Sequence, residues 1–300
     1  MSFSYETKNE LCRLPVQKLC CARAEAYGIL LYCNTFSATE VRVITENPNF
    51  AERLPKLFRR AFGLSFDRQP DKEQTEGKRI FQITDPRKLN HIINVLGYDP
   101  QQNLVLHINF AFMEEACDQA AFLRGAFFAG GSITDPQKRY HLELTTSHLQ
   151  VSRELGSLLQ ECGYPPKSLS RGGSLITYFK QSDQIEDFLT LIGAPVAAMN
   201  VMSAKLEKDL RNSVNRRLNC DSANLDKAVE AAQEQMEAIR RLQAAELLEQ
   251  LRQRGLKLAV VSNKPDETTR TLAARFFPGL AALGQRDGIP SKPAPEMVWS

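Results

Sequence analysis

The seven cysteines are the residues of this chain best suited to metal or redox chemistry, because a deprotonated thiol can bind a metal or form a disulfide. They are scattered along the 300 residues as Cys12, Cys20, Cys21, Cys33, Cys117, Cys162 and Cys220. Their number is odd and no Cys-x-x-Cys pair occurs, whereas disulfide frameworks and structural zinc sites usually show regular spacings. The pattern therefore predicts reduced thiols with structural roles.

Histidine is the other common metal ligand, and two of the four histidines, His141 and His148, lie on or beside a predicted strand. We interpret both as structural, since no cysteine or carboxylate stands beside them at the spacing of a metal site. The sequence thus predicts no metal and no cofactor.

A third group of reactive side chains is basic and lies within residues 199–242, a segment without proline or glycine. Good helix formers dominate it, which predicts helix, with a break and a new N-cap near residues 219–222. A basic helix could lie along nucleic-acid phosphates, or it could be a connector whose apolar stripe docks on the rest of the protein. The sequence leaves both alternatives open.

The whole chain has the composition of a soluble globular protein, with 43% apolar and 24% charged residues. Its length allows two domains or one domain with appendages. The formal net charge of +3 is too small to indicate a nucleic-acid binder by itself. No signal peptide and no apolar run of about 18 residues occurs, so we expect a cytoplasmic protein without a membrane span.

The elements that must position these side chains occur in two similar halves. Each half is predicted to run helix, strand, helix, strand, helix, with one further strand near its first turn. The predicted elements are 20–37, 39–46, 49–64, 78–85 and 86–98 in the first half and 115–131, 140–147, 149–164, 174–181 and 182–194 in the second. A repeat of about a hundred residues indicates a pseudo-two-fold domain.

The first helix of each half is unusually poor in side chains. Gly125, Ala129 and Gly130 leave one face of the second helix nearly bare, and Gly28 falls on Gly125 when the two halves are aligned with an offset of 97 residues. Glycine inside a helix costs about 1 kcal/mol relative to alanine, so such a face needs a packing reason. We expect the two helices to pack against each other.

These segments carry a family resemblance. "CCARAEAYGILLYCN", "FLRGAFFAGGSITDPQKRYHLEL" and "NVMSAKLEKDLRNSVNRRLNCDSANLDKAVEAAQEQMEAI" resemble the WhiA family, bacterial DNA-binding regulators with a LAGLIDADG homing-endonuclease-like domain. The resemblance implies an α+β fold with a pseudo-two-fold tandem repeat, residues 1–108 and 109–198, and a helical linker, residues 199–242. It also implies a nucleoid-associated protein linked to cell division, chromosome segregation or sporulation.

In the endonucleases that share this fold, an acidic residue near the tip of each central helix helps to hold divalent metal. The matching positions here are Cys33 and Gly130, which supply no carboxylate. Asp135 follows shortly after, but its "TDP" context is typical of a turn. We therefore expect no DNA cleavage.

The resemblance further implies that the sheet faces and a basic helix contact DNA phosphates and base edges. The candidate residues are Arg42, Lys78, Arg79, Lys138, Arg139, Arg171, Lys180, Lys205, Lys208, Arg211, Arg216 and Arg217.

The last segment, residues 243–300, departs from the family pattern. "LKLAVVSNKP" and "GIPSKPAPEMVW" resemble phosphate-binding motifs of haloacid-dehalogenase-type phosphatases, with Ser262 and Lys292 in the matching positions. The Asp-x-Asp nucleophile of that family occurs nowhere in the chain. We expect a truncated α/β fragment with a vestigial phosphate site, in place of the family's helix-turn-helix.

Taken together, these observations predict a non-catalytic regulator that binds double-stranded DNA, with specific binding impaired by loss of the helix-turn-helix. Other transcription or division regulators are further expected partners. The alternatives are a phosphatase fragment of the haloacid-dehalogenase type, an active homing endonuclease, and an interaction scaffold without DNA affinity.

Overall fold

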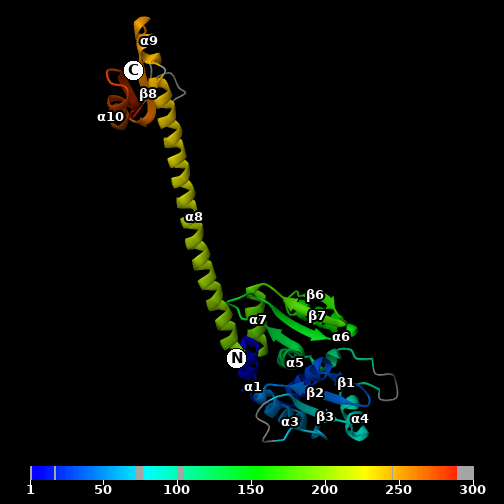
Figure 1. Ribbon diagram of the computed structural model, residues 1–300. Coiled ribbons are helices and arrows are strands. Elements are labelled where there is room, and N and C mark those ends of the chain that lie inside the picture. The colour runs from blue at the N-terminus through cyan, green and yellow to red at the C-terminus, as the bar shows by residue number, and fades with distance from the viewer. Residues whose placement is uncertain (1, 17, 72–76, 100–104, 245, 289–300) are drawn as a thin grey trace. The chain divides into compact units, whose positions relative to one another are not determined.

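The computed structural model describes residues 2–16, 18–71, 77–99, 105–244 and 246–288 (Figure 1). The chain forms two compact units, Met1–Arg211 and Asn212–Ser300, which we call unit 1 and unit 2. The boundary between them falls inside the segment that the sequence predicts to be a helical linker.

The first half of unit 1 has the predicted order of helices and strands. Its strands form an antiparallel sheet in the order β1-β2-β3, and Arg68 adds an isolated bridge to Gln82 of β3. The elements are α1 (Phe3–Cys12), α2 (Leu19–Tyr32), β1 (Thr35–Phe36), β2 (Val41–Thr45), α3 (Pro48–Phe62), β3 (Arg79–Ile83), α4 (Pro86–Val95) and the short 3-10 helix η1 (Phe110–Phe112).

The second half repeats this order around a four-stranded antiparallel sheet, β4-β5-β7-β6. Strands β1 and β4 are the additional strands that the sequence predicts near the first turns, whereas β6 was not predicted. The elements are α5 (Ala116–Gly130), β4 (Gly131–Ile133), β5 (Leu142–Thr146), α6 (Leu149–Glu161), β6 (Lys167–Arg171), β7 (Ser174–Phe179) and α7 (Ser182–Ile192).

Local capping explains why several of these helices begin and end where they do. The side chain of Asn47 accepts from the backbone N–H of Phe50, and Pro48 occupies the first turn of α3. Gly63 ends that helix in the left-handed conformation, with φ of +70°. Asp85 caps α4 in the same way as Asn47 caps α3.

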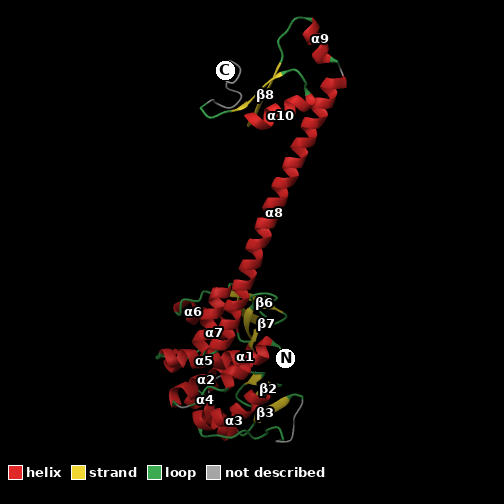
Figure 2. Cartoon of the chain, turned by 90° about the vertical axis from the view of Figure 1, so that its left-hand side faces the viewer, coloured by secondary structure: helices red, strands yellow, loops and turns green. Residues whose placement is uncertain are grey.

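Each sheet buries one face against the helices. Along β2 the side chains of Val41 and Val43 are buried while Arg42 between them is exposed, and Leu142 and Leu144 of β5 are buried in the same alternating manner. Figure 2 shows the strands of both sheets on one side of unit 1 and most of its helices on the other. Because Arg42 and all residues of β6 are exposed, no helix among the described residues covers the opposite face of either sheet.

Helices α2 and α5 lie side by side in the middle of unit 1 (Figure 2). A Cβ atom on Gly28 would stand 2.1 Å from the backbone oxygen of Phe122, and one on Gly125 would stand 2.1 Å from that of Glu25. Since Phe122 is 97 residues after Glu25, the two contacts are symmetric. The helix backbones touch at their glycines, and no larger residue fits there without movement.

The other two residues of the bare face, Ala129 and Gly130, do not contact α2 in this way. A Cβ on Gly130 would stand 2.4 Å from the backbone oxygen of Thr145 in β5 and 2.8 Å from the ring of Tyr32. Ala129 is half-buried against the core. Both lie at the end of α5, where the helix meets the second sheet.

The following helix, α8 (Pro195–Ala244), is continuous, so the predicted break near residues 219–222 is wrong. Asparagine and serine there lower helix propensity only slightly, and neither proline nor glycine interrupts the segment. Within unit 1, Ala197, Val201 and Ala204 are buried on one stripe of α8. The carboxylate of Glu10 in α1 accepts from the N–H groups of residues 196 and 197, at 2.7 and 2.9 Å, and so caps the start of α8.

Unit 2 continues from α8 into α9 (Leu247–Gln253), β8 (Ala259–Pro265), α10 (Asp266–Phe276) and β9 (Ala281–Gln285). Strands β8 and β9 pair in parallel, and α10 lies between them in the chain. Over the described part of the chain, no helix combines the length and apolar character needed to cross a membrane.

Candidate nucleic-acid interface

The helix-free face of the first sheet carries a basic row. The pairing of the strands places Thr35, Arg42, Gln82 and Arg68 next to one another across the sheet. The guanidinium of Arg42 donates to the hydroxyl of Thr35 at 3.2 Å and lies 3.7 Å from the carboxylate of Glu40. Arg42 and Arg68 are both exposed, so this face presents two cations on a polar row.

The helix-free face of the second sheet is similar but more exposed. Lys167 and Arg171, at the two ends of β6, point to the same face, because they are four positions apart along the strand. The register places Lys167 opposite Tyr178, and the ammonium of Lys180 lies 5.2 Å from that ring centroid. All five residues of β6 are exposed. We refer to this basic face and the basic face of the first sheet together as the two sheet faces.

Most of the candidates predicted on strands and turns of unit 1 are on its surface. Arg42, Lys78, Lys138, Arg139, Arg171 and Lys180 are exposed. Arg79 is different, because it has only 7% of its surface exposed and donates to the backbone oxygen of Glu46 at 3.2 Å. Its side chain points to the same buried side of β3 as that of Phe81, two residues later, so it cannot reach a duplex from that position.

The candidates on α8 divide into two groups. Lys205 forms an ion pair with Asp183 of α7. Lys208 donates to the backbone oxygen of Pro136 at 2.6 Å and lies 4.3 Å from the centroid of the Tyr140 ring. These two lysines attach the start of α8 to unit 1, which favours the connector interpretation for this part of the helix.

The other three basic residues of α8, Arg211, Arg216 and Arg217, are exposed. They remain candidates for phosphate contacts. The two interpretations left open by the sequence thus apply to different parts of α8. Before residue 209 the helix docks on unit 1, and after it the basic residues are exposed and could contact phosphates.

Sequence reasoning missed two cations of the sheet faces, Arg68 and Lys167. The missed strand β6 explains Lys167: Gly172 and Gly173, with φ of +56° and +82°, form the two-residue turn of a hairpin. A Gly-Gly pair between two strand-like runs is a known hairpin signal and could have revealed it. Arg68 lies in an irregular segment and gave no such signal.

At the tips of the central helices, neither matching position can bind a hard metal ion. The thiol of Cys33 donates to the backbone oxygens of Leu30 and Thr35 at 3.2 and 3.1 Å, and burial raises its pKa to about 12. Gly130 has no room even for a methyl group, because the Thr145 oxygen blocks it.

A cation stands at the end of α5 instead. The ammonium of Lys8 donates to the backbone oxygen of Phe128 at 3.1 Å and lies 5.6 Å from the centroid of the Phe127 ring. Burial lowers the pKa of Lys8 to about 8. The positive charge of a lysine at a helix C-terminus complements the carbonyl groups there. A metal site would need negatively charged ligands at this place instead.

The remaining predicted polar residues have local partners. Asp135 accepts from the backbone N–H of Gln137 at 2.9 Å, which is a turn contact. His141 pairs with Glu143 at 3.1 Å, and burial lowers the pKa of His148 at the start of α6. Ser262 in β8 accepts from the backbone N–H of Lys264 at 3.2 Å. Lys292 lies outside the described residues.

Although the cysteines are scattered along the sequence, three of them lie together in the structure. All seven are free thiols, but Cys20, Cys21 and Cys117 lie together with Asp118, their ligand atoms all within 4.8 Å of one another. This cluster is at the opposite end of α2 and α5 from the tips.

Two protein-family models match the chain. The WhiA LAGLIDADG-like domain matches residues 119–211, and the WhiA C-terminal HTH domain matches residues 214–278. The helix-turn-helix segment thus contains Arg216 and Arg217, and the LAGLIDADG-like segment ends at Arg211.

Several curated proteins are similar over nearly their whole length. A probable cell division protein WhiA from Ruminiclostridium cellulolyticum is 33% identical over 95% of this chain and 93% of its own. The protein of the same name from Heliobacterium modesticaldum is 34% identical over 95% of this chain and 92% of its own. These names refer to cell division, and they give no support to the expected link with sporulation.

Among solved structures, the full-length WhiA from Thermatoga maritima has a TM-score of 0.59 at 19% identity, covering 81% of this chain and 80% of that chain. The N-terminal LAGLIDADG domain of a WhiA protein has a TM-score of 0.50 and covers 64% of this chain. The mixed α+β, LAGLIDADG-like fold is therefore confirmed.

The expected loss of the helix-turn-helix is wrong, because the family model for that domain extends through residues 214–278. The haloacid-dehalogenase resemblance rested on the short motifs "LKLAVVSNKP" and "GIPSKPAPEMVW", and the first of them, residues 256–265, lies inside the segment that matches the helix-turn-helix model. The truncated domain and the impaired specific binding are therefore not supported, whereas the vestigial phosphate site at Ser262 and Lys292 stays a prediction.

Proposed function

The chain belongs to the WhiA family, and from this membership we propose that it is a non-catalytic regulator that binds double-stranded DNA and acts in cell division. The match of residues 214–278 to the family's helix-turn-helix domain carries the proposal. A helix-turn-helix reads base edges in the major groove with its second helix.

The two sheet faces support a second contact with DNA. Arg42, Lys167 and Arg171 provide cations on regular strands, and Arg68 adds one from an isolated bridge beside β3. Such residues neutralise phosphates and set the orientation of a protein on the duplex without reading its sequence. We therefore assign specificity to unit 2 and supporting phosphate contacts to unit 1.

The proposal of a non-catalytic role rests on the tips of α2 and α5. Cys33 is hydrogen-bonded and protonated, Gly130 is enclosed by backbone, and Lys8 places a cation at the end of α5. Hydrolysis of a phosphodiester by the two-metal route needs oxygen ligands at such a place. Incubation of plasmid DNA with the full chain and Mg²⁺ or Mn²⁺ should give no cleavage.

Titration of a labelled duplex with the full chain at low and high salt tests the proposal. We expect binding that weakens with salt, and enrichment of a preferred sequence when the chain selects from random duplexes. Replacing Arg216 and Arg217 by alanine should reduce the affinity for the selected sequence. Arg153→Ala is the matched control, because Arg153 is exposed on α6, on the helix side of unit 1. Absence of binding at both salt concentrations would leave an interaction scaffold without DNA affinity.

A further inference from the structure

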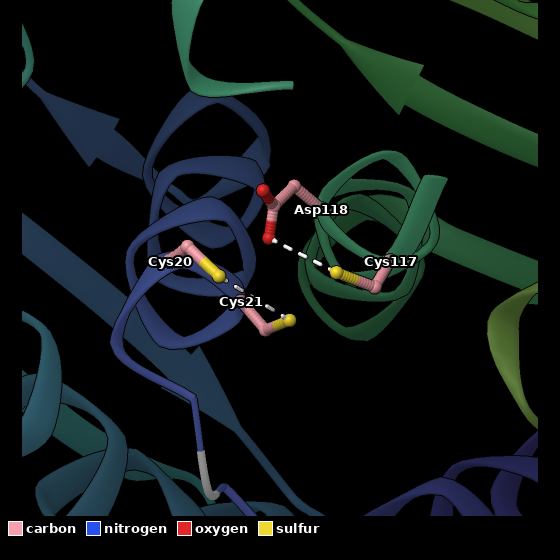
Figure 3. Close-up of side chains that lie close together, drawn as sticks. All are labelled: Cys20, Cys21, Cys117 and Asp118. Atoms are coloured by element: carbon pink, nitrogen blue, oxygen red, sulfur yellow. Dashed lines mark hydrogen bonds between the residues drawn. The ribbon is translucent and has the colours of Figure 1, made fainter. Parts of the chain in front are cut away.

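The cysteine cluster joins the first turns of the two central helices. Cys20 and Cys21 belong to the start of α2, and Cys117 and Asp118 belong to the start of α5. Figure 3 shows the four side chains directed toward one another across the gap between the two helices. Their ligand atoms all lie within 4.8 Å of one another.

The pseudo-two-fold symmetry of unit 1 produces this arrangement. The offset of 97 residues that superposes Gly28 on Gly125 also superposes Cys20 on Cys117 and Cys21 on Asp118. Each helix therefore contributes two ligand-type side chains from equivalent positions. Four groups around a two-fold axis are a natural basis for a tetrahedral site.

The distances agree with those of a tetrahedral metal centre. In a zinc site with Zn–S bonds of about 2.3 Å and a Zn–O bond of about 2.1 Å, two sulfurs lie about 3.8 Å apart, and a sulfur and an oxygen about 3.6 Å apart. The sulfurs of Cys20 and Cys21 are 3.9 Å apart, and the sulfur of Cys117 is 3.6 Å from Oδ1 of Asp118.

Asp118 gives a second, independent indication of a cation. Its surface is only 5% exposed, it accepts from the thiol of Cys117 within the cluster, and it takes part in no ion pair among the described residues. A buried carboxylate is costly unless it is paired with a cation or binds a metal. Glu25, the other carboxylate buried on α2 and α5, has two arginines.

We propose that Cys20, Cys21, Cys117 and Asp118 bind one zinc ion, which clamps the starts of α2 and α5 together. Three sulfurs and one carboxylate oxygen suit zinc, whereas magnesium and calcium require oxygen ligands. The three thiols bind as thiolates and release their protons to solvent on binding. Cys20 and Cys117 are exposed, so the ion can enter from solvent.

This site is separate from the metal position of the endonucleases in both place and chemistry. It is at the starts of the central helices, whereas the endonuclease position is at their tips. Its role is to stabilise the seam between the repeats, and it goes beyond the proposed function, which would survive without it.

Cobalt(II) is the probe for the test, because its bonds to thiolates give a charge-transfer absorption. The full chain, kept reduced with a thiol-free phosphine, is titrated with cobalt(II) and then with zinc. We expect absorption that saturates at one cobalt per chain and disappears when zinc displaces it. Zinc should also raise the Tm of the chain as its concentration increases.

Variants separate this site from adventitious binding. Cys21→Ser and Cys117→Ser should abolish the thiolate absorption or weaken metal affinity at least about tenfold, and Asp118→Asn should weaken it by a similar factor. The double variant Cys162→Ser/Cys220→Ser, which leaves the cluster intact, should bind as the parent does. Circular dichroism confirms that each variant is folded.

Two results would overturn the proposal. The first is a reduced parent chain that gives no thiolate absorption with cobalt, including the case in which these cysteines only form a disulfide on oxidation. The second is absorption that persists in Cys117→Ser or is lost in the Cys162→Ser/Cys220→Ser control. Neither result bears on DNA binding, which is measured separately.

Discussion

Gly125 shows how a single residue sets the geometry of unit 1. A Cβ atom there would lie 2.1 Å from the backbone oxygen of Glu25, which belongs to the partner helix and cannot rotate away. Overpacking of a core costs about 1–3 kcal/mol, and occasionally more, when atoms must shift. We expect Gly125→Ala to lower the free energy of unfolding by about 3 kcal/mol. The measurement is urea unfolding followed by near-UV circular dichroism of the seven tyrosines, which all lie in unit 1.

Gly156 is the matched control for that substitution. It is also inside a helix, α6, but a Cβ there meets nothing within 4 Å. Gly156→Ala should therefore stabilise unit 1 by about 0.5–1 kcal/mol, the usual gain from removing a helical glycine. Equal effects of the two substitutions would contradict the close contact of α2 with α5.

Lys8 predicts a dependence of stability on pH. Burial lowers its pKa to about 8 in the folded chain, below its value of about 10.4 when unfolded. Between these values the unfolded chain binds a proton that the folded chain lacks, so this group makes stability rise with pH from about 8 to about 10. Below pH 8 both states are protonated, and the cost of burying the charge is constant.

The difference in unfolding free energy between the parent chain and Lys8→Met isolates this effect. We expect the unfolding free energy of the parent to rise relative to that of Lys8→Met between pH 8 and 10, and the difference to stay constant between pH 6 and 7. Lys56→Met, at an exposed position on α3, should show a constant difference over the whole range. A flat difference for Lys8→Met as well would show that the ammonium is not desolvated.

At the scale of elements, one buried carboxylate and its two arginines connect four helices of unit 1. Glu25 of α2 accepts from Arg53 of α3 at 2.6 and 2.9 Å and from Arg124 of α5 at 2.9 Å. Arg53 also donates to the backbone oxygen of Leu14, and Arg124 to that of Ile192 at the end of α7. The network thus fixes the helices around the central pair.

Removing the charge of Glu25 should be costly, because both arginines would then be left without their counter-ion. Breaking a buried ion pair from one side costs roughly 3–5 kcal/mol, and we expect Glu25→Gln to lower the stability of unit 1 by this amount. Asp183→Asn breaks the exposed pair with Lys205 and should cost far less, because solvent screens that pair. Tyrosine circular dichroism in urea measures both, and similar losses would show that the network is solvated.

The elements also show what the sequence could predict. The capped helices α3 and α4 and the alternating strands β2 and β5 follow from local signals. Strand β6 was missed because its residues, Lys167–Arg171, are all exposed and carry no apolar alternation. The break predicted in α8 is wrong because residues 219–222 lower helix propensity only slightly, and no proline or glycine interrupts the helix there.

The candidate site depended on contacts between distant residues. The offset of 97 residues that pairs Gly28 with Gly125 also pairs Cys20 with Cys117, so the repeat itself carries the signal for the cysteine cluster. The burial of Arg79 and the docking of Lys208 on Tyr140 have no local signal, because they arise from the packing of whole elements.

At the scale of the whole molecule, the salt dependence of binding can show whether both units contact one duplex. Each phosphate contact contributes about 0.9 to the slope of log affinity against log salt concentration, through release of counter-ions. If the second sheet face contacts phosphates, Lys167→Ala/Arg171→Ala should reduce that slope by about 1.8. The pair Arg216→Ala/Arg217→Ala should do the same if those arginines also contact phosphates.

Combining the four substitutions distinguishes the possible arrangements. If both units bind the same duplex together, the reductions in slope should add, and Arg153→Ala should leave the slope unchanged. If the helix-turn-helix segment alone binds DNA, the Lys167/Arg171 pair should change neither slope nor affinity. Because the cations of the sheet faces lie on fixed strands and carry no base readout, their loss should weaken binding to selected and unrelated duplexes by the same factor.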